Sequence, residues 1–141
     1  MNLKQVIDTL NNIAISQPEI NQVIESGNIY DLNSERNAKF GVFCATQRTH
    51  SYDLEAGQNT FNFFLYYVDR QQSDNDNKIE VQSTAIEVLK NIIRTFAYEY
   101  DIEVLTVDFD VFEESFAQLC AGAYATVSIV ADDENNCLDI F

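Results

Sequence analysis

The chain of 141 residues has the length of one domain, and its 46% hydrophobic and 12% aromatic residues are enough to build a core. A formal net charge of −15 argues against non-specific binding of nucleic acid, because binding phosphates requires clustered Lys and Arg. No apolar run approaches the roughly 18 residues that span a bilayer. We therefore expect a single domain over residues 1–141 with no membrane partner.

The acidic residues are unevenly distributed along the chain. Residues 71–141 contain 15 acidic and three basic residues, and neither Lys nor Arg follows Arg94. One end or face of the fold should therefore carry a strong negative potential. It can be a solvated surface, a docking face for a basic partner, or the wall of a channel that repels DNA and lets it slide. The candidate residues for this lumen or docking face are Asp108, Asp110, Glu113, Glu114, Asp132, Asp133 and Glu134.

Apolar residues at intervals of three and four predict an amphipathic helix over 2–16, and Pro18 either ends it or starts a short second turn. A polar loop over 20–37 follows, with a short extended piece around residues 29–32. Residues 39–46 are rich in strand-forming side chains, and Gly41 indicates a bulge or a close contact. We expect the polar stretch 47–58 to be a link.

Residues 60–70 give the clearest strand signal in the chain. Phe61, Phe63, Leu65 and Tyr67 alternate with Asn62, Phe64, Tyr66 and Val68, so both faces of the strand are largely apolar. A chain this short has few elements to cover two faces of a sheet. Phe64 and Tyr66 are therefore candidate interface residues, although they could also complete an ordinary core.

The second half of the chain predicts a long helix over 79–100, with an apolar stripe made by Ala85, Val88, Leu89, Ile92, Ile93 and Phe96. Strands follow over 103–112, where Leu105, Val107, Phe109 and Val111 should face inward, and over 123–131, with a turn at 113–122 between them. Residues 131–141 should form an acidic, partly extended tail that ends in three further candidate interface residues, Leu138, Ile140 and Phe141.

Together these elements predict an α+β fold with a four-stranded, mostly antiparallel sheet. The N-terminal helix and the long helix should pack on one face of that sheet. Two strand pairs and two helices account for most of the chain, and no linker or internal repeat divides it.

We find no convincing catalytic, metal or cofactor site in the sequence. Cys44 and His50 could form a thiol–imidazole pair, and a small hydrolase using Cys44 is the weakest alternative, because nothing positions a third group. The stretch 74–78 lacks the glycine and the ligand spacing of a calcium loop. Four glycines in all leave no phosphate-binding loop. We therefore expect a protein that acts by assembly and has neither enzymatic activity nor a cofactor.

Several stretches, covering about three quarters of the chain, resemble small virion proteins of tailed bacteriophages, of the tail-completion or tail-terminator type. They are GNIYDL (27–32), TFNF and LYYVD within 60–69, QST (82–84) with Leu89 and the pair Ile92–Ile93, and residues 112–127. The resemblance implies an α+β subunit, without catalytic residues, that forms a ring of six or twelve copies at the head–tail junction or at the tail end. DNA would pass through this ring without specific binding.

The resemblance also implies that the ring docks onto other connector, portal or tail proteins of the virion, after assembly in the cytoplasm of the bacterial host. One alternative is a neck or connector ring that adjoins the portal. Another is an acidic DNA mimic that binds a basic partner as a monomer or dimer, with a steep dependence on salt.

Overall fold

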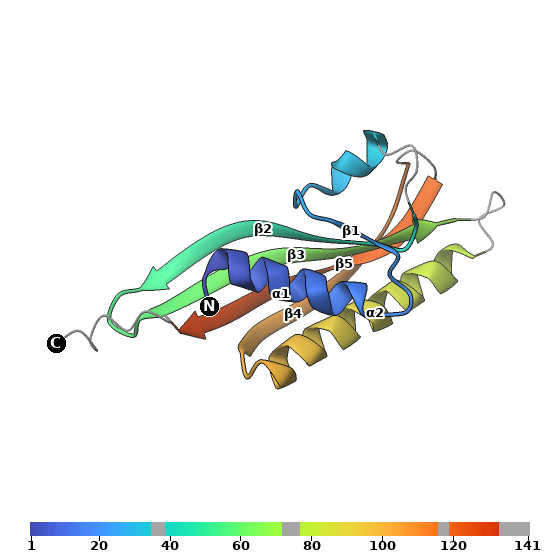
Figure 1. Ribbon diagram of the computed structural model, residues 1–141. Helices are drawn as coiled ribbons and strands as arrows, with labels where there is room; N and C mark the ends of the chain where they lie inside the picture. The colour runs from blue at the N-terminus through green and yellow to red at the C-terminus, as the bar shows by residue number, and fades with distance from the viewer. Residues whose placement is uncertain (35–38, 72–76, 116–118, 133–141) are drawn as a thin grey trace.

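The computed structural model describes residues 1–34, 39–71, 77–115 and 119–132, and these ranges form one α+β unit (Figure 1). Helix α1 spans Leu3–Ile15 and helix α2 spans Lys78–Glu99. The strands are β1 (Gln22–Ile24), β2 (Val42–Asp53), β3 (Gln58–Arg70), β4 (Glu103–Ser115) and β5 (Leu119–Asp132), and a 3-10 helix, η1, spans Ile29–Ser34. No helix in these ranges is long and apolar enough to cross a membrane.

The described strands form one mixed sheet of five strands in the order β1-β2-β3-β5-β4. β1 pairs with β2 in parallel, whereas all other neighbours are antiparallel. The prediction of an α+β fold is confirmed, but the prediction of four strands is wrong. The extra strand is β1, where three residues pair with Val42, Phe43 and Cys44. The extended piece predicted around residues 29–32 is instead the 3-10 helix η1.

The sheet is also longer than the sequence indicates. β2 continues to Asp53 and β3 begins at Gln58, so most of the predicted link 47–58 is the outer half of a long β-hairpin. Residues 47–53 are polar because this half of β2 is largely exposed, which removes the alternation that marks a half-buried strand. The predicted turn at 113–122 is narrower too, because β4 reaches Ser115 and β5 begins at Leu119.

Both helices lie on the same face of the sheet, as the sequence predicts (Figure 1). The six apolar residues of the predicted stripe on α2 are its buried residues, and they pack with α1 and the sheet into the main core. On β3, Phe61, Phe63, Leu65 and Tyr67 point into this core and are almost fully buried. The period-two pattern of β3 and the helical stripe of α2 therefore identify the core correctly.

The predicted inward face of β4 is only partly correct. Leu105, Val107 and Val111 are 57%, 36% and 50% exposed, and Phe109 is half-buried. The physical reason is the place of β4 at the end of the strand order, while α2 packs mainly over β5 and β3. The sequence shows the alternation of this strand but cannot show that α2 covers it less than it covers β5 and β3.

Two glycines allow close backbone contacts. A Cβ atom on Gly41 would lie 2.2 Å from the carbonyl oxygen of Glu19, which confirms the close contact predicted there. A Cβ atom on Gly122 would lie 2.0 Å from the carbonyl oxygen of Tyr67 and 3.1 Å from the ring of Phe112. Gly122 and Phe112 are direct cross-strand neighbours, so the missing side chain leaves room for the aromatic ring.

Candidate assembly surface

The sheet has a far face, opposite the two helices, and η1 covers one end of it. There Ile29 and Leu32 of η1 belong to a second, smaller core. The sheet residues of this core are Ile24, Val42, Cys44, Val68 and Cys120. Packing against the 3-10 helix therefore buries only this end of the far face.

Beyond η1, four aromatic side chains from three strands form one connected group, here called the aromatic cluster: Phe64 and Tyr66 of β3, Phe112 of β4 and Tyr124 of β5. Its shortest ring-centroid distances are 5.1 Å between Phe64 and Tyr124 and 5.4 Å between Tyr66 and Tyr124. The Phe112 ring lies 6.1 Å from that of Tyr66. All four side chains are half-buried.

Phe64 and Tyr66 thus lie where the sequence predicts, on the face away from the helices. Local sequence patterns do not identify Phe112 and Tyr124 as members of the cluster, because their membership depends on strand register. Tyr66 pairs with Tyr124, and Gly122 pairs with Phe112. Alternation within a strand predicts which face of the sheet each residue lies on. It does not predict which residue of the next strand becomes its cross-strand neighbour.

A charged side chain adjoins the aromatic cluster on each side. β2 has a bulge between Gln47 and His50, and Arg48 lies in this bulge. Its guanidinium carbon is 4.4 Å above the centre of the Phe64 ring. On the other side, Asp110 is the cross-strand neighbour of Tyr124. Burial, together with the negative charge of Asp110, raises the pKa of Tyr124. The cluster therefore has a basic side toward β2 and an acidic side toward β4.

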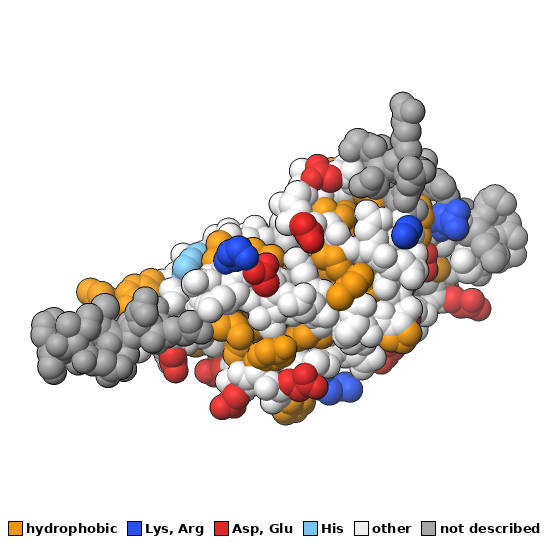
Figure 2. Space-filling model, in the orientation of Figure 1, with side chains coloured by type: hydrophobic (Ala, Val, Ile, Leu, Met, Phe, Trp, Pro, Cys, Tyr) orange, Lys and Arg blue, Asp and Glu red, His pale blue; other side chains and the backbone are white. Residues whose placement is uncertain are grey.

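The predicted acidic face is only partly brought together. Asp108, Asp110 and Glu114 pair with Thr126, Tyr124 and Cys120 and so share the far face of β4. Glu113 points the opposite way and contacts Lys78, with 3.8 Å between the charged atoms. Asp132 ends β5, while Asp133 and Glu134 lie outside the described residues, as do Leu138, Ile140 and Phe141. On the side that Figure 2 shows, acidic side chains are scattered and form no single patch.

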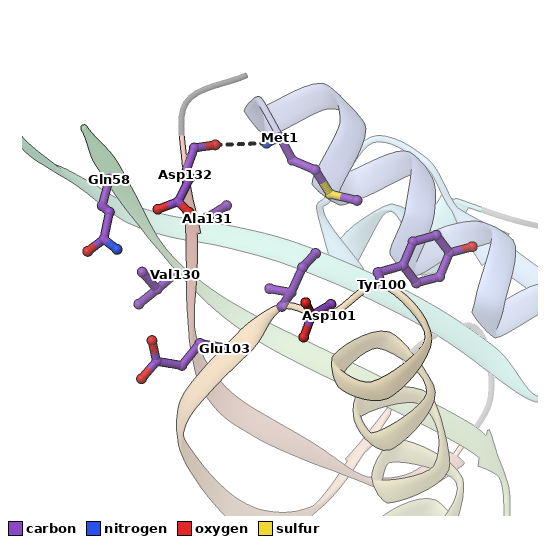
Figure 3. A pocket seen from close by; sticks show the side chains of 9 residues that line it. Met1, Gln58, Tyr100, Asp101, Glu103, Val130, Ala131 and Asp132 are labelled. Carbon is purple, nitrogen blue, oxygen red and sulfur yellow. Dashed lines mark hydrogen bonds between the residues drawn. The ribbon is translucent and has the colours of Figure 1, made fainter. Parts of the chain in front are cut away.

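An open hollow of about 470 Å³ lies at the end of the sheet where β4 begins (Figure 3). Asp101, Glu103 and Asp132 are among its lining residues, and the amino group of Met1 donates a hydrogen bond of 3.1 Å to the carbonyl oxygen of Asp132. Within the described ranges, no cluster of His, Cys, Asp and Glu has the arrangement of a metal site. The hollow therefore concentrates negative charge at this end of the sheet.

The thiol–imidazole pair considered for Cys44 and His50 is not formed. Cys44 is buried in the small core on the far face, whereas the His50 ring lies 4.4 Å from that of Phe61 on the helix-covered face. The two side chains are thus on opposite sides of the sheet. His50 instead hydrogen-bonds to Asn59 at 2.8 Å.

Cys44 should be nearly inert toward alkylation in the folded protein. Burial raises the pKa of its thiol to about 11, so at pH 8 the reactive thiolate should be about 100-fold rarer than for a thiol of ordinary pKa near 9. We expect iodoacetamide to label Cys44 at least 100-fold more slowly in the native chain than in denaturant, as measured by mass spectrometry of the Cys44 peptide. Equal rates in the two conditions would contradict this burial.

Comparison with known proteins gives no family assignment: no protein-family model and no curated protein matches the sequence. Functional interpretation therefore depends on the geometry of the far face and on the sequence pattern. The residues that this geometry brings together are the aromatic cluster, Arg48 on one side of it, and Asp108 and Asp110 on the other.

Proposed function

We propose that the chain is a structural subunit of a tailed-bacteriophage virion that assembles into a closed ring at the head–tail junction or at the tail end. The virion part of this proposal comes from the resemblance to tail-completion and tail-terminator proteins. The assembly part is supported by the chain's own surface. A second copy, or another virion protein, would cover apolar surface that the monomer leaves partly in water.

The proposal that the chain assembles rests on the aromatic cluster. Phe64, Tyr66, Phe112 and Tyr124 form a contiguous, half-exposed group on the sheet face opposite α1 and α2, beyond the end that η1 covers. Burying apolar surface stabilises a contact by about 25 cal/mol per Å². Aromatic side chains supply much of the contact energy in protein interfaces, since they are large and lose little conformational freedom.

The far face of β4 supports the passage of DNA. Asp108, Asp110 and Glu114 lie on this face, and no described Lys or Arg forms an ion pair with any of them. If this face lines the ring, the carboxylates repel DNA phosphates and so prevent the duplex from sticking. Specific DNA contacts would require the opposite charge.

The same acidic row favours a second candidate, an accessory protein that binds a basic protein in the way DNA would. Such a protein should be a monomer or dimer, and its complex should weaken steeply as salt rises. A neck ring that adjoins the portal differs from the main proposal only in its position and its neighbours.

Labelling of intact virions with antibodies against this chain tests the proposed position. We expect gold particles at the head–tail junction or at the tail end, and none along the tail or over the head. The proposal would be overturned if purified virions lacked the protein while the host lysate held it in a salt-sensitive complex with a basic protein. That result would favour the DNA mimic.

A further inference from the structure

We propose that neighbouring copies in the ring join edge to edge, with the first half of β4 (residues 103–108) of one copy pairing antiparallel to residues 47–53 of β2 in the next copy. This inference rests on the proposed ring and names the contact that closes it. It would make the sheet continuous around the ring, with helices on one side and the aromatic cluster on the other.

Both sheet edges have room for a neighbouring strand. β4 ends the strand order, so its outer side has no strand within the described part of the chain. On the opposite edge, β1 pairs only with Val42, Phe43 and Cys44. Beyond this pairing, Gly27 lies beside Ala45 and Thr46, and the Thr46 hydroxyl donates a 2.7 Å hydrogen bond to the carbonyl oxygen of Gly27. The part of β2 with no described backbone on its outer side is therefore residues 47–53. Each edge presents backbone donors and acceptors that can pair with another chain.

β4 has few of the features that protect a lone edge. Proteins usually guard such edges with Lys, Pro, short strands or bulges. β4 is 13 residues long and contains neither Lys nor Pro, although a bulge lies between Val104 and Val107. Leu105, Val107 and Val111 also leave apolar surface exposed along it. The acidic residues are its main protection, and they select which strand can pair with it.

Charge distinguishes the possible pairings. Pairing β4 with β4 of a second copy would bring Asp108 and Asp110 near the same carboxylates of the partner, which is unfavourable. Residues 47–53 contain Arg48 and His50 and only one acid, Asp53. Arg48 lies on the far face, above Phe64, and Asp108 lies on that face as well. The complementary partner of β4 is therefore β2 of another copy.

The strand directions fit, and the levels fit for the first half of β4. From Asp110 onward, an unshifted β4 would lie opposite Cys44 and Val42, which already pair with β1. β2 and β4 run in opposite directions, because three antiparallel pairings separate them. A neighbour that keeps its helices on the same side therefore presents β2 antiparallel to β4 without being turned over. Thr46 pairs with Phe64, Phe64 with Thr126, and Thr126 with Asp108. An unshifted neighbour would thus place its Thr46 at the level of Asp108, so the pairing ends at this level. The neighbour's long Arg48 side chain can then reach the Asp108 carboxylate.

Such a contact uses two different surfaces of each copy and therefore repeats from copy to copy. It closes into a ring when the rotation per copy divides a full turn. The aromatic cluster then stays on the continuous far face, where another virion protein can cover it, and does not form the contact between ring subunits.

Charge reversal in the full-length chain tests this contact. We expect Arg48→Glu and Asp108→Arg each to raise the concentration at half-assembly at least about tenfold, measured by mass photometry, because each places like charges across the edge. The double variant should restore assembly. Arg94→Glu makes the same charge change on the exposed surface of α2 and should leave the ring unchanged.

Circular dichroism and the unfolding midpoint identify any variant that fails to fold. If Arg48→Glu misfolds, Asp108→Arg tests the same contact from the β4 edge. Intact rings of a folded Arg48→Glu protein, or a double variant that does not reassemble, would overturn the edge contact and leave the ring proposal standing. A wild-type chain that stays monomeric would overturn both proposals.

Discussion

Replacing Phe63 with alanine should lower the free energy of unfolding by about 3–5 kcal/mol, the usual cost of deleting a buried aromatic side chain from a core. Phe63 is fully buried on the helix-covered face of β3, in the main core between the sheet and the two helices. β3 lies in the middle of the strand order, so the surrounding structure has little freedom to collapse into the cavity. Urea denaturation monitored by circular dichroism measures the change.

The adjacent residue provides a matched control. Phe64→Ala removes the same atoms from the same strand, but on the far face, where the side chain is half-buried. We expect it to cost about 1–2 kcal/mol, because truncating a partly exposed side chain leaves a site that water can refill. If Phe64→Ala cost as much as Phe63→Ala, the aromatic cluster would be as fully buried as the main core. It could then not serve as an assembly surface.

Gly122→Ala should have the second-largest effect, a loss of about 2–3 kcal/mol. The new methyl group would lie 2.0 Å from the carbonyl oxygen of Tyr67, a backbone atom that cannot rotate away. Pairing between β5 and β3 must therefore shift, and the Phe112 ring must move off the sheet. Thermal unfolding reports the stability, and near-ultraviolet circular dichroism should show that the aromatic cluster is disturbed.

Gly57→Ala separates steric overlap from backbone strain. Gly57 has a φ of +65°, but a Cβ atom there would meet nothing within 4 Å. This substitution should cost only about 1 kcal/mol, from the left-handed conformation alone, and leave the aromatic signal unchanged. Equal losses for Gly57→Ala and Gly122→Ala would contradict the close approach of β3 to β5 at Gly122.

Local patterns in the sequence were sufficient for the elements that bury one face. The stripe of α2 and the alternation of β3 are each set by residues close in sequence, so periodicity reports them directly. β1 and the outer half of β2 lack such a pattern. β1 is only three residues long, and residues 47–53 are polar on both faces. These strands form because a neighbouring strand offers backbone hydrogen bonds, which side-chain periodicity does not record.

The candidate surface shows the same division between local and long-range information. The far-face position of Phe64 and Tyr66 follows from alternation within one strand. Phe112 and Tyr124 join them only through the register of three strands, and Arg48 joins through a bulge in β2. Glu113 was grouped with the other acids although the alternation of β4 places it on the opposite face from Asp108 and Asp110. Strand alternation alone is enough to separate these residues.

Native mass spectrometry of the purified full-length chain, over a range of protein concentrations, tests the proposed ring most directly. The account predicts one dominant species whose mass is six or twelve times that of the 16.1 kDa chain, with no long series of larger multimers, because a closed ring leaves no edge for further growth. A stable monomer at every concentration would contradict it.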